Sequence, residues 1–248
     1  MTPILMVSFV FVPFEEDNHG DLLAFMPLFV KGTIPSEIAL LTQLSWLALA
    51  ANQLSGMLPT ELGILTQLTL LSLYENVLSG TLPTELGYLS LLNLLSLRDN
   101  KFVGSIPSEL ELLANMRVLT LKNNLLTSTI PTGLGFLTNL DVLQLQENKL
   151  TGKIPSELGL CTRMGWLNLA NNSLLGTVPY ELASLWNTLH TLKFEGNALL
   201  SGNIPDSLCS INGTCIFSPI SPCEGNYGLS FDCTRQLCGC DCPCSDGI

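Results

Sequence analysis

Residues 68–89 read LTLLSLYENVLSGTLPTELGYL, and the spacing of leucines and turn residues in this stretch recurs along most of the chain. Its proline belongs to a set with a period of 24 residues and a final step of 26: Pro35, Pro59, Pro83, Pro107, Pro131, Pro155, Pro179 and Pro205. Its asparagine belongs to a second set with the same period, whose last member is one residue late: Asn52, Asn76, Asn100, Asn124, Asn148, Asn172 and Asn197. Two residue types that keep one period over so many copies predict a solenoid of stacked units.

The first half of this unit alternates like a short strand. We expect Leu71 and Leu73 to point inward, and Leu70, Ser72 and Tyr74 to point outward.

The second half of the unit predicts a turn and an outer helical segment. Asn76 can bond backbone groups of its turn and of the next coil, Gly80 allows a tight bend, and Pro83 fixes φ where the outer turn begins. Thr84 is expected to cap a short helical turn, with Glu85 in its favourable first turn. We therefore predict a capping role on the outer face, and no cation site, for the periodic acids Glu37, Glu61, Glu85, Glu109, Glu157 and Glu181.

The pattern LxxLxLxxNxLxGxIPxxLGxL runs over about residues 32–208 and resembles the plant-type extracellular leucine-rich repeats of receptor kinases, receptor-like proteins and polygalacturonase inhibitors. The resemblance implies an α/β solenoid, a right-handed superhelix with a parallel sheet on its concave side and short helical or 3-10 turns on its convex side. It also implies ligand binding by the concave face or its flank. Ser128 replaces the usual glycine, and the last unit has insertions near residues 186–187 and 199–201.

Three regions are expected along the chain. Residues 20–208 form the repeats, one degenerate copy followed by about seven copies of 24 residues, with Leu23 and Phe25 at the strand positions of the degenerate copy. Residues 1–19 contain an apolar segment that is too short for a membrane span. Three interpretations of it stay open: a signal peptide, a packed cap, and the edge of a truncated longer array. Residues 209–248 form a Cys-rich C-terminal cap.

Cysteine usage favours an oxidising compartment. An even number of cysteines in a short Gly- and Pro-rich tail predicts a disulfide-stapled cap, whose connectivity stays open: Cys209, Cys215, Cys223, Cys233, Cys238, Cys240, Cys242 and Cys244. A metal cluster is the less favoured alternative, because the spacing lacks the CxxC pairs of zinc sites. Cys161 stands where other repeats have leucine and is expected to be a buried free thiol. Two glycosylation sequons begin at Asn171 and Asn212. We expect a secreted or cell-surface protein.

Charge and motifs exclude several function classes. The formal net charge of −11 disfavours nucleic acid and anionic lipid as partners. No phosphate loop, nucleophile elbow or His-acid motif is present in the sequence. We therefore expect that the protein is not an enzyme and has neither a cofactor nor a metal site. No further stretch of the chain is long and apolar enough to predict a transmembrane segment.

Ligand contacts are expected where the outward strand positions differ between repeats. The residue types that favour binding at these positions are Trp46, Tyr74, Arg98, Lys122, Gln144, Gln146, Trp166 and Lys193. Trp46 and Trp166 are five coils apart, or about 24 Å at strand spacing, so a protein, peptide or glycan could span them but a small molecule could not.

Three functions compete. The first is a recognition module for a protein, peptide or carbohydrate ligand, with a signalling co-receptor as a further candidate partner. The second is an inhibitor of a secreted hydrolase. The third is a structural adhesion or ice-facing surface, suggested by a row of hydroxyls beside the prolines that Met57 and Lys153 interrupt: Thr33, Thr81, Thr129 and Thr177.

Overall fold

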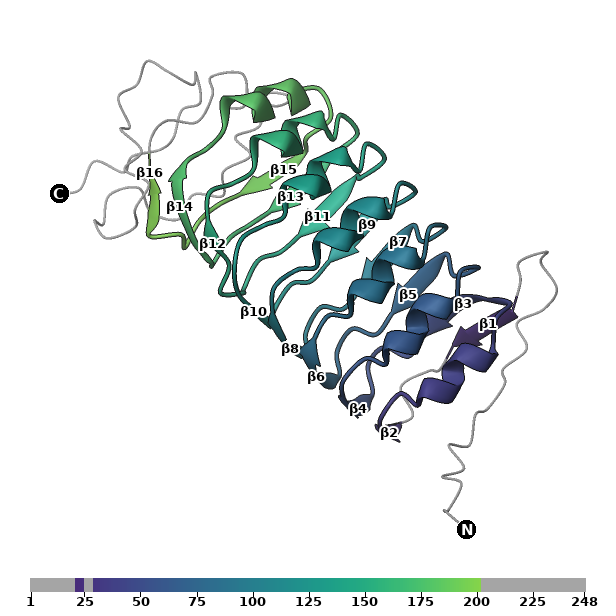
Figure 1. Ribbon diagram of the computed structural model, residues 1–248. Coiled ribbons are helices and arrows are strands. Elements are labelled where there is room, and N and C mark those ends of the chain that lie inside the picture. The colour runs from purple at the N-terminus through teal and green to yellow at the C-terminus, as the bar shows by residue number, and fades with distance from the viewer. Residues whose placement is uncertain (1–20, 25–28, 202–248) are drawn as a thin grey trace, which may run out of the picture.

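The computed structural model describes residues 21–24 and 29–201, and these residues form a solenoid of stacked coils (Figure 1). Each coil contributes one strand to an eight-stranded parallel sheet, here called the main sheet, in which the strands follow one another in chain order. Its strands are β1 (Asp21–Ala24), β3 (Leu44–Ala48), β5 (Leu70–Ser72), β7 (Leu94–Ser96), β9 (Val118–Thr120), β11 (Val142–Gln144), β13 (Trp166–Asn168) and β15 (Thr191–Lys193). The expected α/β solenoid is confirmed.

The opposite side of the coils carries a row of short 3-10 helices (Figure 1). In the part of the chain that the structure describes, these are η1 (Ser36–Leu40), η2 (Thr60–Ile64), η3 (Thr84–Tyr88), η4 (Ser108–Leu112), η5 (Thr132–Phe136), η6 (Ser156–Leu160) and η7 (Tyr180–Leu185). The last helix is one residue longer than the others, which accommodates the insertion expected near residues 186–187.

Short strands between the main sheet and the helices form two lateral sheets. The first contains β2 (Lys31–Gly32), β4 (Gln53–Gly56), β6 (Val77–Thr81), β8 (Lys101–Gly104) and β10 (Leu125–Leu126). The second contains β12 (Thr151–Gly152), β14 (Ser173–Thr177) and β16 (Leu199–Ser201). The break between them falls at the coil where Ser128 replaces glycine, and Ser128 adopts φ +67°, a conformation that favours glycine.

The core is a stack of leucines along the axis of the solenoid. Leu71 and Leu73 have no exposed surface, which confirms their predicted inward orientation. Leu23 of the degenerate first coil pairs with Leu47 of the next strand, as its register predicts. Burial of each such side chain contributes about 1.5–3 kcal/mol relative to an exposed position, and stacking shares this contribution between neighbouring coils.

The ladder asparagines satisfy buried backbone groups between coils. Asn124 Oδ1 accepts a hydrogen bond from the backbone N–H of Phe102 at 3.0 Å. Its Nδ2 donates to the carbonyl of Leu97 in the preceding coil at 3.0 Å, and to those of Leu121 and Lys122 in its own turn at 3.1 and 3.2 Å. Equivalent bonds to the preceding coil are made by Asn76, Asn100, Asn148, Asn172 and Asn197. The asparagines therefore connect adjacent coils where strand pairing ends.

The expected hydroxyl cap on the outer helices is wrong. Pro83 precedes the first helical residue of η3 in an extended conformation, and no side chain caps the helix. Thr84 is itself the first helical residue, one position too late to cap, and its hydroxyl lies 3.3 Å from the carboxylate of Glu85. Glu85 does lie in the first turn, as predicted. The hydroxyl therefore orients the acid and leaves the backbone N–H groups without a side-chain cap.

Glycine at the fourth helical position lets successive outer helices approach closely. A Cβ on Gly63 would lie 2.6 Å from the backbone oxygen of Glu85 in the next coil. Between η4 and η5 this arrangement is exchanged: Glu111 takes the fourth position, and Gly133 takes the second, where other helices have glutamate. The Glu111 carboxylate fills the space that a side chain on Gly133 would need. Glu111 and Gly133 thus compensate each other: the larger side chain lies on η4, and the smaller residue lies on η5.

The C-terminal cysteines, the sequon at Asn212, Phe25 and the apolar N-terminal segment lie outside the described residues.

The exchanged pair predicts non-additive stability changes. We expect Gly133→Glu to lower the free energy of unfolding by about 1–3 kcal/mol, because its side chain meets Glu111. We expect Glu111→Gly to cost about 1 kcal/mol, through added backbone freedom. The double variant Glu111→Gly/Gly133→Glu restores the arrangement of the other coils and should be more stable than Gly133→Glu alone. Urea unfolding of all four proteins tests this, and additive changes would contradict the packing described.

Candidate ligand-binding face

The outward side of the main sheet, here called the concave face, begins with an apolar column. Its members are Trp46, Leu70, Leu94, Val118, Val142 and Trp166, and Thr191 ends it. The two tryptophans are 37% and 39% exposed, and the residues between them are half-buried. Five strand steps separate Trp46 from Trp166, about 24 Å, so this column offers an extended apolar strip and no single pocket.

The second column is polar, and most of it is hidden between neighbouring strands. Its buried members are Ser72, Ser96, Thr120 and Asn168. The Thr120 hydroxyl donates to Gln144 Oε1 at 3.2 Å on the next strand. Gln144 and Lys193 of this column are half-buried and keep part of their side chains accessible. The second column therefore supports the sheet more than it offers contact surface.

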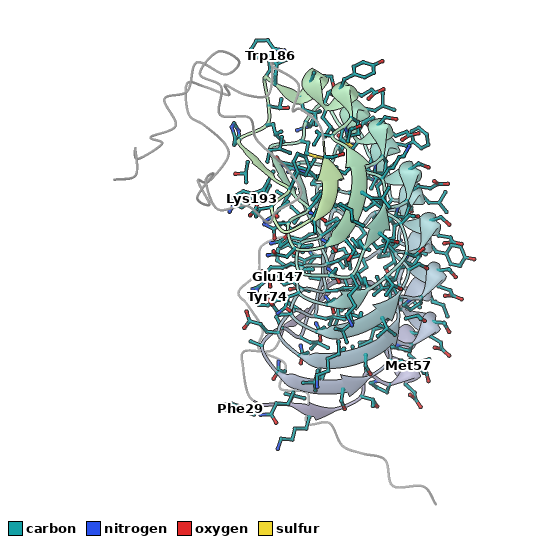
Figure 2. The ribbon with its side chains drawn as sticks, turned by 90° about the vertical axis from the view of Figure 1, so that its left-hand side faces the viewer. Phe29, Met57, Tyr74, Glu147, Trp186 and Lys193 are labelled. Atoms are coloured by element: carbon teal, nitrogen blue, oxygen red, sulfur yellow. The ribbon has the colours of Figure 1, made fainter. Side chains whose placement is uncertain are left out.

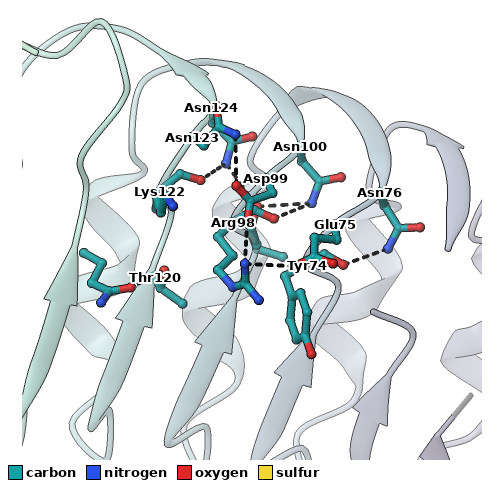
Figure 3. Close-up of polar contacts among 12 residues, drawn as sticks. Tyr74, Glu75, Asn76, Arg98, Asp99, Asn100, Thr120, Lys122, Asn123 and Asn124 are labelled. Atoms are coloured by element: carbon teal, nitrogen blue, oxygen red, sulfur yellow. Dashed lines mark hydrogen bonds and ion pairs between the residues drawn. The ribbon is translucent and has the colours of Figure 1, made fainter. Parts of the chain in front are cut away.

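The third column, just beyond the strand ends, carries an ionic network (Figure 3). The Arg98 guanidinium stacks on the Tyr74 ring, 4.0 Å from its centroid. The same group contacts Glu75 at 3.1 Å and also contacts Asp99. Asn123 Nδ2 donates to Asp99 Oδ1 at 2.9 Å, which extends the network to a third coil. These contacts fix the orientation of the Tyr74 and Arg98 side chains before any ligand arrives.

An acidic rim borders this network, and sequence reasoning missed most of it. Glu75, Asp99 and Glu147 each precede a ladder asparagine and adopt φ values of 54°, 57° and 60°. This left-handed backbone places one side chain per coil at the edge of the concave face. In the last described coil Gly196 takes this place, and half-buried Glu195 of the third column adds a carboxylate to the rim. The signal was available in the sequence. The position before the ladder asparagine recurs with the same period, and Glu75, Asp99 and Glu147 make it acidic.

The structure brings together three of the predicted contact residues, and it separates Trp46 from Trp166 by five strand steps. Tyr74, Arg98 and Lys122 are neighbours at the ends of successive strands. Figure 2 shows Tyr74, Glu147 and Lys193 along one side of the solenoid, away from the helices.

Two of the predicted contact residues are less available than expected. Arg98 is already paired with two carboxylates, so it is a weaker anchor for a ligand anion than the sequence suggested. Gln146 is only 8% exposed, and its Oε1 is enclosed with no hydrogen-bond partner in the described part of the chain.

Cys161 is a buried free thiol, as predicted. Its Sγ lies 3.5 Å from the backbone oxygens of Leu134 and Gly135. Burial raises the pKa of this thiol to about 11, so the group stays protonated at neutral pH and is a poor nucleophile. Within residues 21–24 and 29–201, no cluster of three or more His, Cys, Asp or Glu side chains could hold a metal ion.

A hollow of about 480 Å³ lies at the starts of η6 and η7 and the segments that lead into them, away from the concave face. It is lined by Lys153, Thr177, Tyr180 and Glu181, among others. Among the described residues, no helix has the length and apolarity that crossing a membrane requires.

Comparison with known proteins identifies the repeat. A family model of the leucine-rich repeat matches residues 139–161 and 165–185. The crystal structure of the ectodomain of the Arabidopsis thaliana membrane receptor kinase GASSHO1/SCHENGEN3, in complex with CASPARIAN STRIP INTEGRITY FACTOR 2, is 39% identical with a TM-score of 0.71. The similarity covers 74% of this chain and 22% of that one.

Two further structures are informative. The Arabidopsis receptor kinase HAESA, in complex with the peptide hormone IDA and the co-receptor SERK1, is 34% identical with a TM-score of 0.67, over 78% of this chain and 31% of that one. A plant ice-binding protein is 31% identical with a TM-score of 0.61, over 71% of this chain and 58% of that one. The chain spans less than a third of the length of the two receptor ectodomains. A comparison with curated proteins finds no match.

The raised pKa of Cys161 predicts a specific loss of stability at high pH. An unfolded thiol ionises near pH 9.0, whereas the folded thiol ionises near pH 11. Stability from this group is therefore complete below pH 9 and falls as pH rises toward 11, by up to about 1.4 kcal/mol per pH unit. Cys161→Ala should flatten the pH dependence of the unfolding free energy over this interval. Identical slopes for the two proteins would show that the thiol is not desolvated.

Proposed function

Because the chain belongs to the plant-type leucine-rich-repeat proteins, we propose that it is a recognition module that binds a peptide or protein ligand along its concave face. Of the receptor ectodomains to which it is similar, HAESA is crystallised with a peptide hormone and a co-receptor, and GASSHO1/SCHENGEN3 with CASPARIAN STRIP INTEGRITY FACTOR 2. We propose the same class of ligand and an extracellular or cell-surface location for this chain, and no catalytic activity.

The observation that carries the proposal is the contrast between scaffold and surface. The inward positions of the main sheet are leucine in coil after coil, whereas the outward positions change from strand to strand. A constant core with a varied concave face favours recognition of one particular ligand. Stability of the core places little demand on the outward residues, so the core does not explain which residues stand there.

An extended peptide fits the accessible chemistry of this face. Apolar ligand side chains can cover the column from Trp46 to Trp166, while polar ligand groups meet the strand-end network and the acidic rim. Lys122 makes no ion pair with any described residue and can contact a ligand anion. The enclosed oxygen of Gln146 can regain a hydrogen bond if the side chain rotates toward a ligand N–H. A carbohydrate stacked on the tryptophans is the other ligand class that this face accommodates.

Peptide selection tests the proposed concave site. Peptides enriched from a random library on the immobilised protein should lose at least about tenfold in affinity for Tyr74→Ala and for Trp166→Ala, the loss typical of interface anchors. Matched controls are Tyr180→Ala and Trp186→Ala, because these aromatic side chains are exposed in the last described coils away from the concave face. Enriched peptides that depend on the control positions and not on the concave positions would contradict the proposal.

A second candidate function, ice binding, is favoured by one specific arrangement. Exposed hydroxyls recur at one position at or just after the ends of the lateral strands, at Thr33, Thr81, Ser105, Thr129, Thr177 and Ser201. A Cβ on the glycine of the next coil would lie 2.7–2.9 Å from the methyl carbons of Thr33, Thr81 and Thr129. The threonine methyls therefore occupy, in the same way from coil to coil, the space that a side chain on these glycines would need. A plant ice-binding protein also shares the fold.

Thermal hysteresis decides this second candidate. If the hydroxyl row binds ice, the protein should show hysteresis that grows with its concentration. Met57→Thr/Lys153→Thr, which completes the row, should increase the effect, and Thr81→Lys should abolish it. A protein without hysteresis at any concentration, including the variant with the completed row, would exclude ice binding.

We also propose that the protein is glycosylated and that its C-terminal tail is held by disulfides. Asn171 is exposed at the rim of the concave face, with φ 52°, and begins the sequon Asn171-Asn172-Ser173. A glycan there would stand at the rim of the coil that carries Trp166 and would border the proposed ligand site at that end. The sequon at Asn212 and the disulfide-stapled tail remain proposals of the same kind.

A further inference from the structure

The outer helices carry an exposed apolar row that lies outside the proposed ligand-binding face. The last residue of each of the first six 3-10 helices is a large apolar side chain with 51–79% of its surface exposed. We call this row the convex ridge: Leu40, Ile64, Tyr88, Leu112, Phe136 and Leu160. Its residues end the 3-10 helices of six successive coils, and these helices lie on the opposite side of the solenoid from the main sheet (Figure 1).

Core packing does not explain the convex ridge. In η2, Leu62 and the following Leu65 have no exposed surface and complete the core, whereas Ile64 between them is 54% exposed. Single exposed apolar residues are common on protein surfaces and need no explanation. A contiguous row with one member on each of six neighbouring coils is an apolar patch of the kind that marks an interaction surface.

An acidic row runs beside the ridge. A 3-10 helix has three residues per turn, so its second and fifth residues share a face about 6 Å apart along the axis. The second residues are Glu37, Glu61, Glu85, Glu109, Glu157 and Glu181. In η5, where this position is Gly133, the carboxylate of Glu111 fills the space. The acidic row is therefore continuous along the ridge.

This side of the solenoid carries no compensating positive charge on its helices. None of the seven outer helices contains Lys, Arg or His. Among the described residues the ion pairs are those of Arg98 on the concave face, so the carboxylates of the acidic row are not paired. An occupant of the ridge must then bring apolar side chains flanked by positive charge.

We propose that the convex ridge docks a cationic amphipathic helix of a partner protein. The coils repeat at about 4.8 Å from strand to strand. The outer helices also lie close together, because a Cβ on Gly63 would meet the backbone oxygen of Glu85 in the next coil. An α-helix advances 5.4 Å per turn, so a helix lying along the ridge places about one apolar side chain per turn between successive ridge residues. Lys or Arg on the flank of that helix faces the acidic row. An extended strand repeats its side chains every 6.6–6.8 Å or so on one face and matches the coil spacing less well.

The charge pattern disfavours the other occupants of such a surface. A second copy of this chain would bring an identical acidic row against the first, and an anionic membrane would be repelled. The proposal is independent of the concave site, because no residue of the ridge or of the acidic row lies on the main sheet.

The probe is an 18-residue helical peptide of leucine and lysine, with leucine at helical spacing, and its control is the same pattern with glutamate in place of lysine. Fluorescence anisotropy with the full chain should show salt-sensitive binding of the lysine peptide only. Tyr88→Ser/Phe136→Ser should weaken binding at least about tenfold. The matched control Val77→Ser/Val103→Ser, at lateral side chains that are each 40% exposed, should leave it within about twofold.

A second pair of variants separates the acidic row from general charge attraction. Glu85→Gln/Glu109→Gln should weaken binding of the lysine peptide and reduce its salt dependence. Glu147→Gln/Glu195→Gln removes equal charge from the acidic rim of the concave face and should have little effect. Far-ultraviolet circular dichroism and thermal unfolding of each variant establish that the coils are intact.

Four results would overturn the proposal. Equal losses for ridge and lateral variants, or for the two glutamate pairs, would show that the peptide binds by net charge alone. Equal binding of the glutamate peptide would exclude the role of the acidic row. Self-association in sedimentation that the ridge variants abolish would make a second copy the occupant. Capture of the chain by vesicles of zwitterionic lipid, lost in the ridge variants, would make it a membrane surface.

Discussion

The hydrogen bonds of the asparagine ladder are the constraint on which the rest of the structure depends. At the end of each main-sheet strand the chain turns inward, and backbone groups such as the Phe102 N–H and the Leu97 carbonyl become buried without a strand partner. Leaving such groups unpaired costs about 1–3 kcal/mol each. One asparagine per coil pairs them with the neighbouring coil, which fixes the register in which all outward side chains stand.

Much of the fold could be predicted from the sequence, because the 24-residue period assigns each residue to a fixed position in its coil. Leucines at a spacing of two predicted the main-sheet strands, and the place of Cys161 in a leucine position predicted its burial. The hydroxyl cap failed because Pro83, and not Thr84, takes the capping position, which the pattern alone cannot distinguish. The convex ridge was not foreseen, because Ile64 lies between two buried leucines and only the 3-10 geometry separates it from them. Burial of Gln146 depends on neighbouring strands, so no single repeat reveals it.

One repeat unit produces three surfaces with different chemistry. The concave face has an apolar column, a hidden polar column and an ionic network, the combination proposed for peptide recognition. The lateral strands present a row of hydroxyls whose threonine methyls lie over the glycines of the next coil. The convex side combines apolar and acidic rows without cations on its helices. Each surface repeats at the coil spacing, and each is suited to a partner that extends along the solenoid.

Native-state hydrogen exchange of the ladder-bonded amides tests the central role of the asparagines most directly. In the wild-type protein, the Phe102 and Leu78 amides, held by Asn124 and Asn100, should both exchange only through extensive unfolding. In Asn124→Ala, Phe102 should exchange at least about 100-fold faster relative to Leu78, because each coil depends chiefly on its neighbours. Unchanged relative protection of Phe102 would show that the leucine core alone sets the register and that the ladder does not hold the coils together.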